Sequence, residues 1–162
     1  MRPLFALAAV ALACPAFAAE PDYRTVKLEI DIDKPAAEAW AKVGGYCDIS
    51  KWLPQLDCAI TSGDGGVGTV RALAKGRVLE ILVGKTDLSY GYAQPANQGQ
   101  FYNLYHGFME AKPVTDKTSK IVYTLVWDVS DKPNAEAKDK DVAGRKAIFE
   151  NALKNIKKVA EE

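Results

Sequence analysis

The sequence is poor in the residues from which metal and hydrolytic sites are built. Its 162 residues include one histidine and three cysteines, and neither a Cys-x-x-Cys pair nor an H-E-x-x-H motif occurs. No order or spacing of residues suggests a Ser-His-acid set. Lys and Arg together number 21, equal to Asp and Glu, so no charge excess points to nucleic acid or to an anionic membrane. We therefore expect no metal, no cofactor and no nucleic-acid partner.

A long hydrophobic run is also absent. The apolar stretch at residues 4–13 is about ten residues long, half of the roughly 20 that span a bilayer as a helix, which argues against an integral membrane anchor. Arg2 precedes the stretch, and Ala16-Phe17-Ala18 follows it with the small residues of a cleavage point. This pattern predicts a secretory signal peptide at residues 1–18.

Removal of that segment leaves about 144 residues, enough for a single domain at 19–162. We expect this domain in the bacterial periplasm or outside the cell. The alternative is a lipoprotein signal with Cys14 acylated, although Ala11 stands where a larger aliphatic residue is usual.

Two cysteines, Cys47 and Cys58, remain once Cys14 is lost with the leader. An even pair in an oxidising compartment is more simply explained by a disulfide than by free thiols. Ten intervening residues without a nearby His do not match the ligand spacing of a zinc site. We predict a Cys47–Cys58 bond that stiffens the segment through Trp52 and Pro54 and contributes on the order of 3 kcal/mol to stability.

The first ordered elements are a strand and two short helices. Hydrophobic residues alternate with charged ones over 23–33, which is the period of a half-buried strand. Pro35 stands where a helix can begin, and good helix formers fill 36–43 before Gly44 ends the helix. A second short helix is predicted at 46–52.

Two hairpins follow. The glycine-rich segment 62–66 joins predicted strands at 56–61 and 67–74, because its glycines supply the positive φ angles of a turn. The same glycines match a G-x-G-x-x-G pattern, but that fingerprint needs a helix directly afterwards, and here a strand is predicted. A two-residue turn at Lys75-Gly76 would then place Arg71 directly opposite Glu80.

The rest of the chain is mostly strand and ends in a long helix. Strands are predicted at 77–83, 88–93, 101–112 and 120–130. Beyond Pro133-Asn134 the pattern is helical to about Val159. Its apolar stripe has 3.6 spacing and consists of Ile148, Phe149, Ala152, Leu153, Ile156 and Val159. The class is α+β, with an antiparallel sheet of about six to seven strands whose apolar face the terminal helix alone is large enough to cover.

This order of elements resembles the START-like helix-grip (SRPBCC) superfamily, and most closely its polyketide cyclase/dehydrase group. The motifs that carry the resemblance are Trp52-Leu53-Pro54 after the paired helices, Gly68-Thr69-Val70-Arg71, Glu80 in the fourth strand, and 153–158 near the end. The superfamily also includes the birch-pollen-allergen-like proteins and the plant abscisic-acid receptors. The resemblance covers about residues 24–159.

The resemblance implies a curved sheet that grips the terminal helix around a cavity for an apolar or amphipathic small molecule. Leu53 stands where the hormone receptors carry a ligand-binding lysine, and Trp127 stands where they carry an acid, so carboxylate recognition of their type is not expected. A bulky Trp127 would also narrow the pocket. The expected ligand-binding residues are Trp52, Leu53, Arg71, Glu80, Tyr90, Tyr105, Trp127, Phe149 and Leu153.

The fourth strand leaves two interpretations open. Its hydrophobic residues Leu79, Ile81 and Val83 form an apparent core set, which would send Glu80 outward to a solvent-exposed pair with Arg71 worth about 0 to 1 kcal/mol. The resemblance instead turns Glu80 inward, where it needs Arg71 because an unpaired buried charge costs several kcal/mol.

Two functional classes follow. The first is an exported binding or carrier protein for a hydrophobic small molecule or lipid. The second is a cyclase- or dehydratase-like enzyme in which Arg71 polarises a carbonyl and Glu80 or a tyrosine moves a proton. His106 alternates with Tyr105 and is expected to face away from the pocket. A partner-binding module whose cavity is filled by Trp127 and Tyr105 is a third possibility, with no protein partner indicated.

Overall fold

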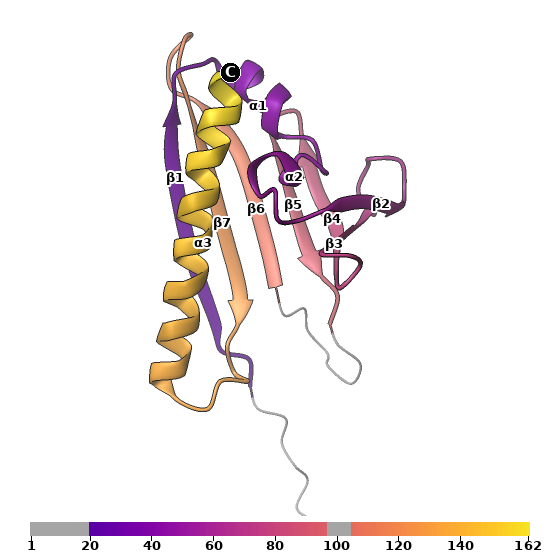
Figure 1. Ribbon diagram of the computed structural model, residues 1–162, viewed down its shortest axis with the longest axis vertical. Helices are drawn as coiled ribbons and strands as arrows, with labels where there is room; N and C mark the ends of the chain where they lie inside the picture. Colours follow the sequence, from indigo (N-terminus) through magenta and orange to yellow (C-terminus); the bar gives the residue numbers. More distant parts are fainter. Residues whose placement is uncertain (1–19, 97–104) are drawn as a thin grey trace, which may run out of the picture.

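The computed structural model describes residues 20–96 and 105–162, and seven antiparallel strands among them form one curved sheet (Figure 1). The predicted signal peptide at 1–18 and the start of the strand predicted at 101–112 lie outside the described residues. The strand order is β1-β7-β6-β5-β4-β3-β2, so β2 to β7 form a meander and the first strand joins beside the last. Their bounds are β1 Tyr23–Ile32, β2 Cys58–Ser62, β3 Val70–Leu73, β4 Val78–Thr86, β5 Ser89–Gln94, β6 Tyr105–Pro113 and β7 Ser119–Asp128.

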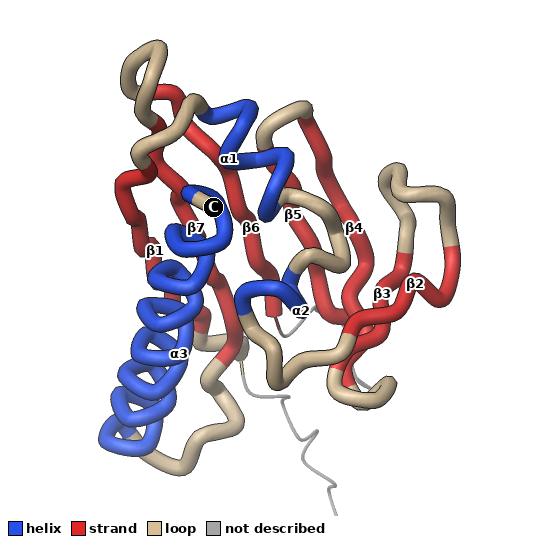
Figure 2. Tube along the Cα trace, turned by 45° about the horizontal axis from the view of Figure 1, so that its top comes forward, coloured by secondary structure: helices blue, strands red, loops and turns tan. Residues whose placement is uncertain are grey.

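Three helices cover one face of this sheet. They are α1 Ala36–Val43, α2 Ile49–Trp52 and α3 Ala135–Glu161. The long helix α3 follows β1 and β7, whereas α1 and α2 lie over the middle of the sheet (Figures 1 and 2). The prediction that the terminal helix alone covers the face is therefore wrong. A helix about 10 Å across covers only about two strands spaced about 4.8 Å apart, so the short helices are needed for the others.

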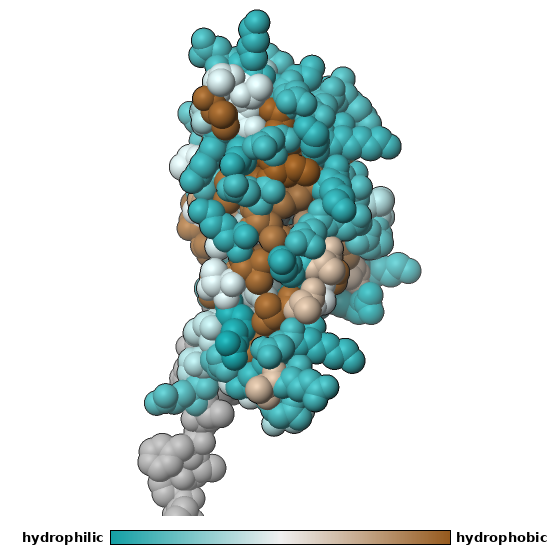
Figure 3. Space-filling view, turned by 90° about the vertical axis from the view of Figure 1, so that its left-hand side faces the viewer, coloured by the Kyte–Doolittle hydropathy of each residue, from teal (hydrophilic) through white to brown (hydrophobic). Residues whose placement is uncertain are grey.

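The helix α3 packs mainly through its C-terminal half. It begins at Asn134, whose side-chain oxygen accepts a hydrogen bond from Ala137 N at 2.9 Å. Its fully buried residues are Ala152, Leu153, Ile156 and Ala160. Ile148 was predicted in the buried stripe but is 52% exposed, whereas its neighbour Phe149 packs against the core. Successive helical residues are turned by about 100° from one another, so the two side chains leave the helix in different directions. Hydrophobic side chains form a band between hydrophilic borders on the side of the molecule shown in Figure 3.

The two predicted hairpins are present. Gly63, Gly65 and Gly68 have φ angles of 92°, 95° and 95°, and strand β3 follows them, which excludes the helix that a dinucleotide fingerprint requires. The β3–β4 connection is wider than the predicted two-residue turn, since strand pairing ends at Leu73 and Val78. The predicted register is nevertheless correct, because both turns are centred on the same point of the chain and place Arg71 opposite Glu80.

The faces of β4 are those that the resemblance implies. Glu80 and Leu82 are 3% and 1% exposed, whereas Leu79 and Val83 are 44% and 53% exposed. The alternative core set of Leu79, Ile81 and Val83 is therefore wrong. Alternation of side chains along a strand divides them between two faces, but it does not indicate which face the helices cover.

No helix among the described residues is both long and apolar enough to cross a membrane.

Candidate functional site

A buried ion pair lies on the covered face, toward the β2 end of the sheet. Arg71 on β3 and Glu80 on β4 are directly opposite, and their side chains are 0% and 4% exposed. Arg71 Nε donates a hydrogen bond to Glu80 Oε2 at 2.8 Å, and Arg71 Nη2 lies 2.6 Å from the same oxygen. Strand register therefore places the two side chains opposite one another.

The segment between α1 and α2 closes over this pair. Arg71 Nη1 donates to the main-chain oxygen of Tyr46, and the Tyr46 hydroxyl donates to the main-chain oxygen of Glu80 at 3.1 Å. The Tyr46 ring lies 4.2 Å from Arg71 Cζ, close enough for a cation–π interaction. A disulfide between Cys47 and Cys58, as predicted, links this segment to β2.

The second carboxylate oxygen of Glu80 is also occupied. Gln94 Nε2 donates to Glu80 Oε1 at 3.2 Å. Burial by itself would lower the pKa of Arg71, but the Tyr90 oxygen and the Glu80 carboxylate outweigh burial, and the pKa of Arg71 is raised. The pair therefore remains an arginine cation bound to a carboxylate with few free acceptor positions.

Aromatic side chains extend the site across the sheet. The rings of Tyr90 and Tyr92 lie 5.7 Å and 4.9 Å from Arg71 Cζ. The hydroxyls of Tyr92 and Tyr123 are 2.9 Å apart, and the Trp52 ring meets the Tyr123 ring edge-on at 6.2 Å. Burial raises the pKa of Tyr90, Tyr92 and Tyr123, so these phenols are neutral at physiological pH.

Among the buried side-chain donors that have no hydrogen-bond partner in the described part of the chain, two lie in this aromatic set. They are Trp52 Nε1 and the hydroxyl of Tyr90, on residues that are 0% and 2% exposed. A buried donor without a partner costs about 1 to 3 kcal/mol, and such groups are rare in folded proteins. Both belong to the aromatic set around Arg71 and Tyr123.

A second polar group is formed by side chains of α3, β7 and β6. Trp127 Nε1 donates to Asp141 Oδ2 at 2.7 Å, and Arg145 Nε donates to the same oxygen at 3.1 Å. The Arg145 guanidinium lies 5.2 Å from the rings of both Tyr105 and Trp127. Partial burial opposes the charge of Asp141, but the hydrogen bonds from Trp127 and Arg145 outweigh it and lower the pKa.

The nine residues expected to bind ligand all face the space between the sheet and the helices. Trp52, Leu53, Arg71, Glu80, Tyr90, Tyr105, Trp127 and Leu153 are buried, and Phe149 is partly buried against them. They form two groups, one around Arg71 and one around Trp127. Tyr92, whose ring stacks on Tyr105 at 6.3 Å, joins the two.

Sequence reasoning missed several members of this site. Tyr92 and Tyr123 had a usable signal, since each shares a strand face with a residue that was selected, Tyr90 and Trp127 respectively. Asp141 and Arg145 are four apart on one helix face, which is the spacing of an ion pair. Tyr46 had no signal, because its position depends on how the loop before α2 folds back.

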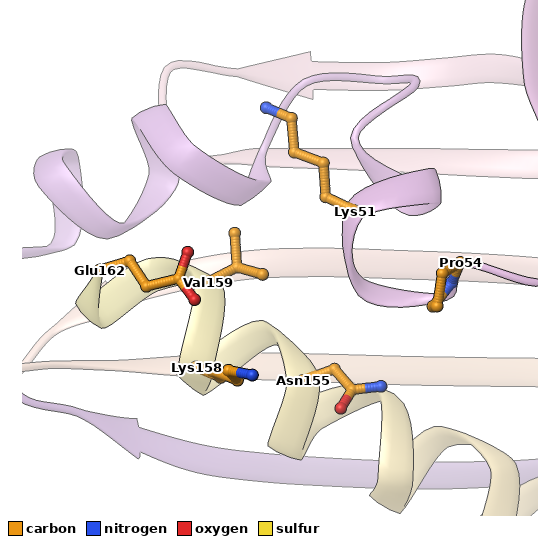
Figure 4. A pocket seen from close by; sticks show the side chains of 6 residues that line it. All are labelled: Lys51, Pro54, Asn155, Lys158, Val159 and Glu162. Carbon is orange, nitrogen blue, oxygen red and sulfur yellow. The ribbon is translucent and has the colours of Figure 1, made fainter.

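The surface of the described residues also has hollows outside this aromatic interior. One hollow of about 440 Å³ lies between α2 and the end of α3, lined by Lys51, Pro54, Asn155, Lys158, Val159 and Glu162 (Figure 4). Four of its six lining residues are polar or charged, and one of them, Asn155, donates through Nδ2 to the main-chain oxygen of Trp52 at 3.0 Å. The aromatic interior, rather than this groove, has the composition of a small-molecule site.

Comparison with known proteins identifies a family whose model matches nearly all of the described chain. A family model described as polyketide cyclase / dehydrase and lipid transport matches residues 23–161. A search of curated proteins finds no match. A solved structure from Nitrosospira multiformis is 26% identical with a TM-score of 0.64, covering 82% of this chain and 93% of that chain.

Two further structures are similar in fold. The protein Ara h 8.0201 is 22% identical with a TM-score of 0.61, covering 86% of this chain and 98% of that chain. A Bacillus thuringiensis protein is 19% identical with a TM-score of 0.64, covering 86% of this chain and all of that chain.

Proposed function

The chain belongs to the polyketide cyclase / dehydrase and lipid transport family, and on that premise we propose that it binds a hydrophobic or amphipathic small molecule between the sheet and α3. The ligand would contact the nine residues named above. Trp52, Trp127, Tyr92 and Tyr123 are each no more than 2% exposed, so entry requires some of these rings to turn aside. Aromatic rings suit such a site because they offer large apolar surfaces with a polar tip.

The observation that carries the proposal is the pair of unpartnered donors. The N–H of Trp52 and the O–H of Tyr90 both need an acceptor in a place that water reaches poorly. A ligand with a carbonyl, ether or hydroxyl oxygen would supply it, and the rest of its surface would meet aromatic and aliphatic side chains. The expected ligand is therefore apolar with one or two oxygen acceptors.

Binding is favoured over the cyclase- or dehydratase-like alternative. Glu80 already accepts hydrogen bonds from Arg71 and Gln94, which leaves it a weak candidate for proton abstraction. Neutral buried tyrosines are also poor bases. Arg71 is held by Glu80 and Tyr46, so a substrate carbonyl would have to displace one of these partners.

We also propose that residues 1–18 direct export to the periplasm or beyond. The Cys47–Cys58 disulfide supports this, because such bonds persist in oxidising compartments. The test is mass measurement of the protein recovered from the periplasm, where a chain beginning at Ala19 is expected. Recovery of the uncleaved chain from the cytoplasm would contradict export.

The function is tested by native mass spectrometry of protein recovered from cells, before and after denaturation, together with titration by the apolar dye 1-anilinonaphthalene-8-sulfonate. We expect a released small molecule or saturable dye binding. Tyr90→Phe removes one donor and keeps the ring, and Trp52→Phe removes the other donor and replaces the indole by a smaller ring. Each should weaken ligand retention about tenfold. Tyr23→Phe, on the exterior, is the matched control. A folded protein with neither adduct nor saturable binding would overturn the proposal.

A further inference from the structure

The strand β1 ends the sheet, and among the described residues only β7 pairs with it. The main-chain oxygen of Asp22, just before β1, accepts a hydrogen bond from Val129 N at 2.9 Å, so even-numbered positions of β1 are directed toward β7. The backbone N–H and C=O groups of odd-numbered positions are directed toward the open edge. There the main-chain oxygen of Asp31 accepts a hydrogen bond from Lys157 Nζ at 2.9 Å. Thr25, Lys27 and Glu29 thus present their N–H and C=O groups at this edge.

A hydrophobic groove accompanies the open edge. It has a volume of about 290 Å³ and is lined by Leu28, Glu29, Ile30, Glu150, Leu153 and Lys154. The apolar band on this side of the molecule is bordered by hydrophilic residues (Figure 3). An exposed strand edge beside apolar side chains is a template for pairing with another strand.

We infer that β1 pairs antiparallel with β1 of a second copy of this chain, about a two-fold axis at Leu28. In this register Lys27 lies opposite Glu29 of the second copy, and Glu29 lies opposite its Lys27, so both charge pairs are complementary. On the covered face, Leu28 meets Leu28 and Val26 meets Ile30. The two sheets become one continuous sheet of fourteen strands.

The charges select this register over its neighbours. Centring the axis on Lys27 would oppose two lysines. Centring it on Glu29 would pair each Lys27 with Asp31 but oppose two glutamates, whereas the Leu28 register contains no pair of like charges. Lys27 has no ion pair with another side chain within residues 20–96 and 105–162, whereas Glu29 binds Lys120 at 2.7 Å. Lys27 is therefore available to the second copy without breaking a contact.

The helix α3 adds to this self-complementarity. Glu150 and Lys154 line the groove beside Leu28 and are one helical turn apart. A two-fold axis places the two copies of α3 antiparallel, so Glu150 of each can approach Lys154 of the other. A surface whose apolar and charged positions both match their own two-fold image fits a second copy of the chain better than an unrelated partner.

The test is sedimentation velocity of the purified protein over a concentration series. Lys27→Glu should raise the dimer dissociation constant roughly 10- to 100-fold, because two attractive pairs become repulsive. Glu29→Lys should act alike, and Lys27→Glu with Glu29→Lys in one chain should restore association. Lys75→Glu, in the β3–β4 turn at the far end of the sheet, makes the same charge change and should leave association unaltered.

Mixing the two single variants gives a second measurement. The variant carrying Lys27→Glu has two acidic positions and the variant carrying Glu29→Lys has two basic ones, so the mixture should form a heterodimer while each alone is monomeric. The Lys27 side chain forms no ion pair within the described residues, so Lys27→Glu should fold normally. Circular dichroism checks this. A wild-type protein that stays monomeric, or a dimer that all of these changes leave unaltered, would overturn the inference.

Discussion

Arg71 and Glu80 face one another across β3 and β4, with Arg71 Nε 2.8 Å from Glu80 Oε2 and neither side chain more than 4% exposed. The pair is held by strand register, by the Tyr46 segment and by Gln94. It therefore links the sheet to the helical layer at the proposed ligand site.

Glu80→Leu should lower the free energy of unfolding by about 3 to 5 kcal/mol, because Arg71 is left as an unpaired buried charge. Arg71→Met combined with Glu80→Leu should recover most of that loss. Urea unfolding measures both. Asp131→Ala, which breaks the exposed pair with Lys132, is the control and should cost no more than about 1 kcal/mol. A loss that small for Glu80→Leu would show that the buried pair is dispensable.

Gly107→Ala should destabilise the protein by about 1 to 3 kcal/mol. A Cβ at this position of β6 would overlap the ring of Tyr92, so the ring would have to leave its place over the strand. Thermal unfolding and near-ultraviolet circular dichroism would report the change. Gly84→Ala, in β4 with open space around the added Cβ, is the matched control. Equal effects for the two variants would contradict the close approach of Tyr92 to β6.

Reduction of the Cys47–Cys58 disulfide should cost on the order of 3 kcal/mol of stability in the chain-entropy model. The bond joins two cysteines that are 11 positions apart in the sequence, and it holds the Tyr46 segment to β2. Urea unfolding with and without a thiol reductant is the measurement. Cys47→Ala with Cys58→Ala should be as unstable as the reduced protein and insensitive to the reductant. Unchanged stability on reduction would contradict a structural role.

Asp141 should stabilise the folded protein most strongly above pH 4. Its pKa is lowered in the folded state from an ordinary value of 3.8, so its contribution is fully present above that value. The contribution is lost as pH falls through the lower folded pKa. Asp141→Asn should therefore be less stable than wild type at pH 7, and the difference should shrink at lower pH.

The control for this pH effect is Asp139→Asn, an exposed residue on the same helix. It should leave the free energy of unfolding nearly unchanged at both pH values. A difference between Asp141→Asn and wild type that is independent of pH would assign the role of Asp141 to packing rather than charge.

The strand pattern could be predicted because local alternation reports local structure. The helix at 36–43 has the predicted bounds, since Pro35 and Gly44 mark its ends in the sequence. The register that opposes Arg71 and Glu80 was also correct, although the turn between their strands is longer than predicted. The pairing of two hairpin strands depends on the midpoint of the turn and not on its length. Lys75 and Gly76 mark that midpoint in the sequence.

Assignment of side chains to the two sheet faces needed more than the alternation. Leu79, Ile81 and Val83 form as regular a hydrophobic row as the inward set, yet Leu79 and Val83 are exposed. Ile148 likewise fits the helical stripe but is 52% exposed. Both errors arise because burial of a strand or helix face depends on segments from elsewhere in the chain that pack against it.

The amino-acid sequence by itself determined the order of elements and the disulfide pairing, because alternation, turn residues and an even cysteine pair act over short distances along the chain. The inward aromatic set was implied by the family resemblance and not by these local patterns. Only the tertiary structure decided that Tyr46 closes over Arg71, that Gln94 binds Glu80 and that Tyr92 joins the two halves of the site. These contacts join residues brought together by the curvature of the sheet and the path of the loop before α2. No local pattern encodes such distances.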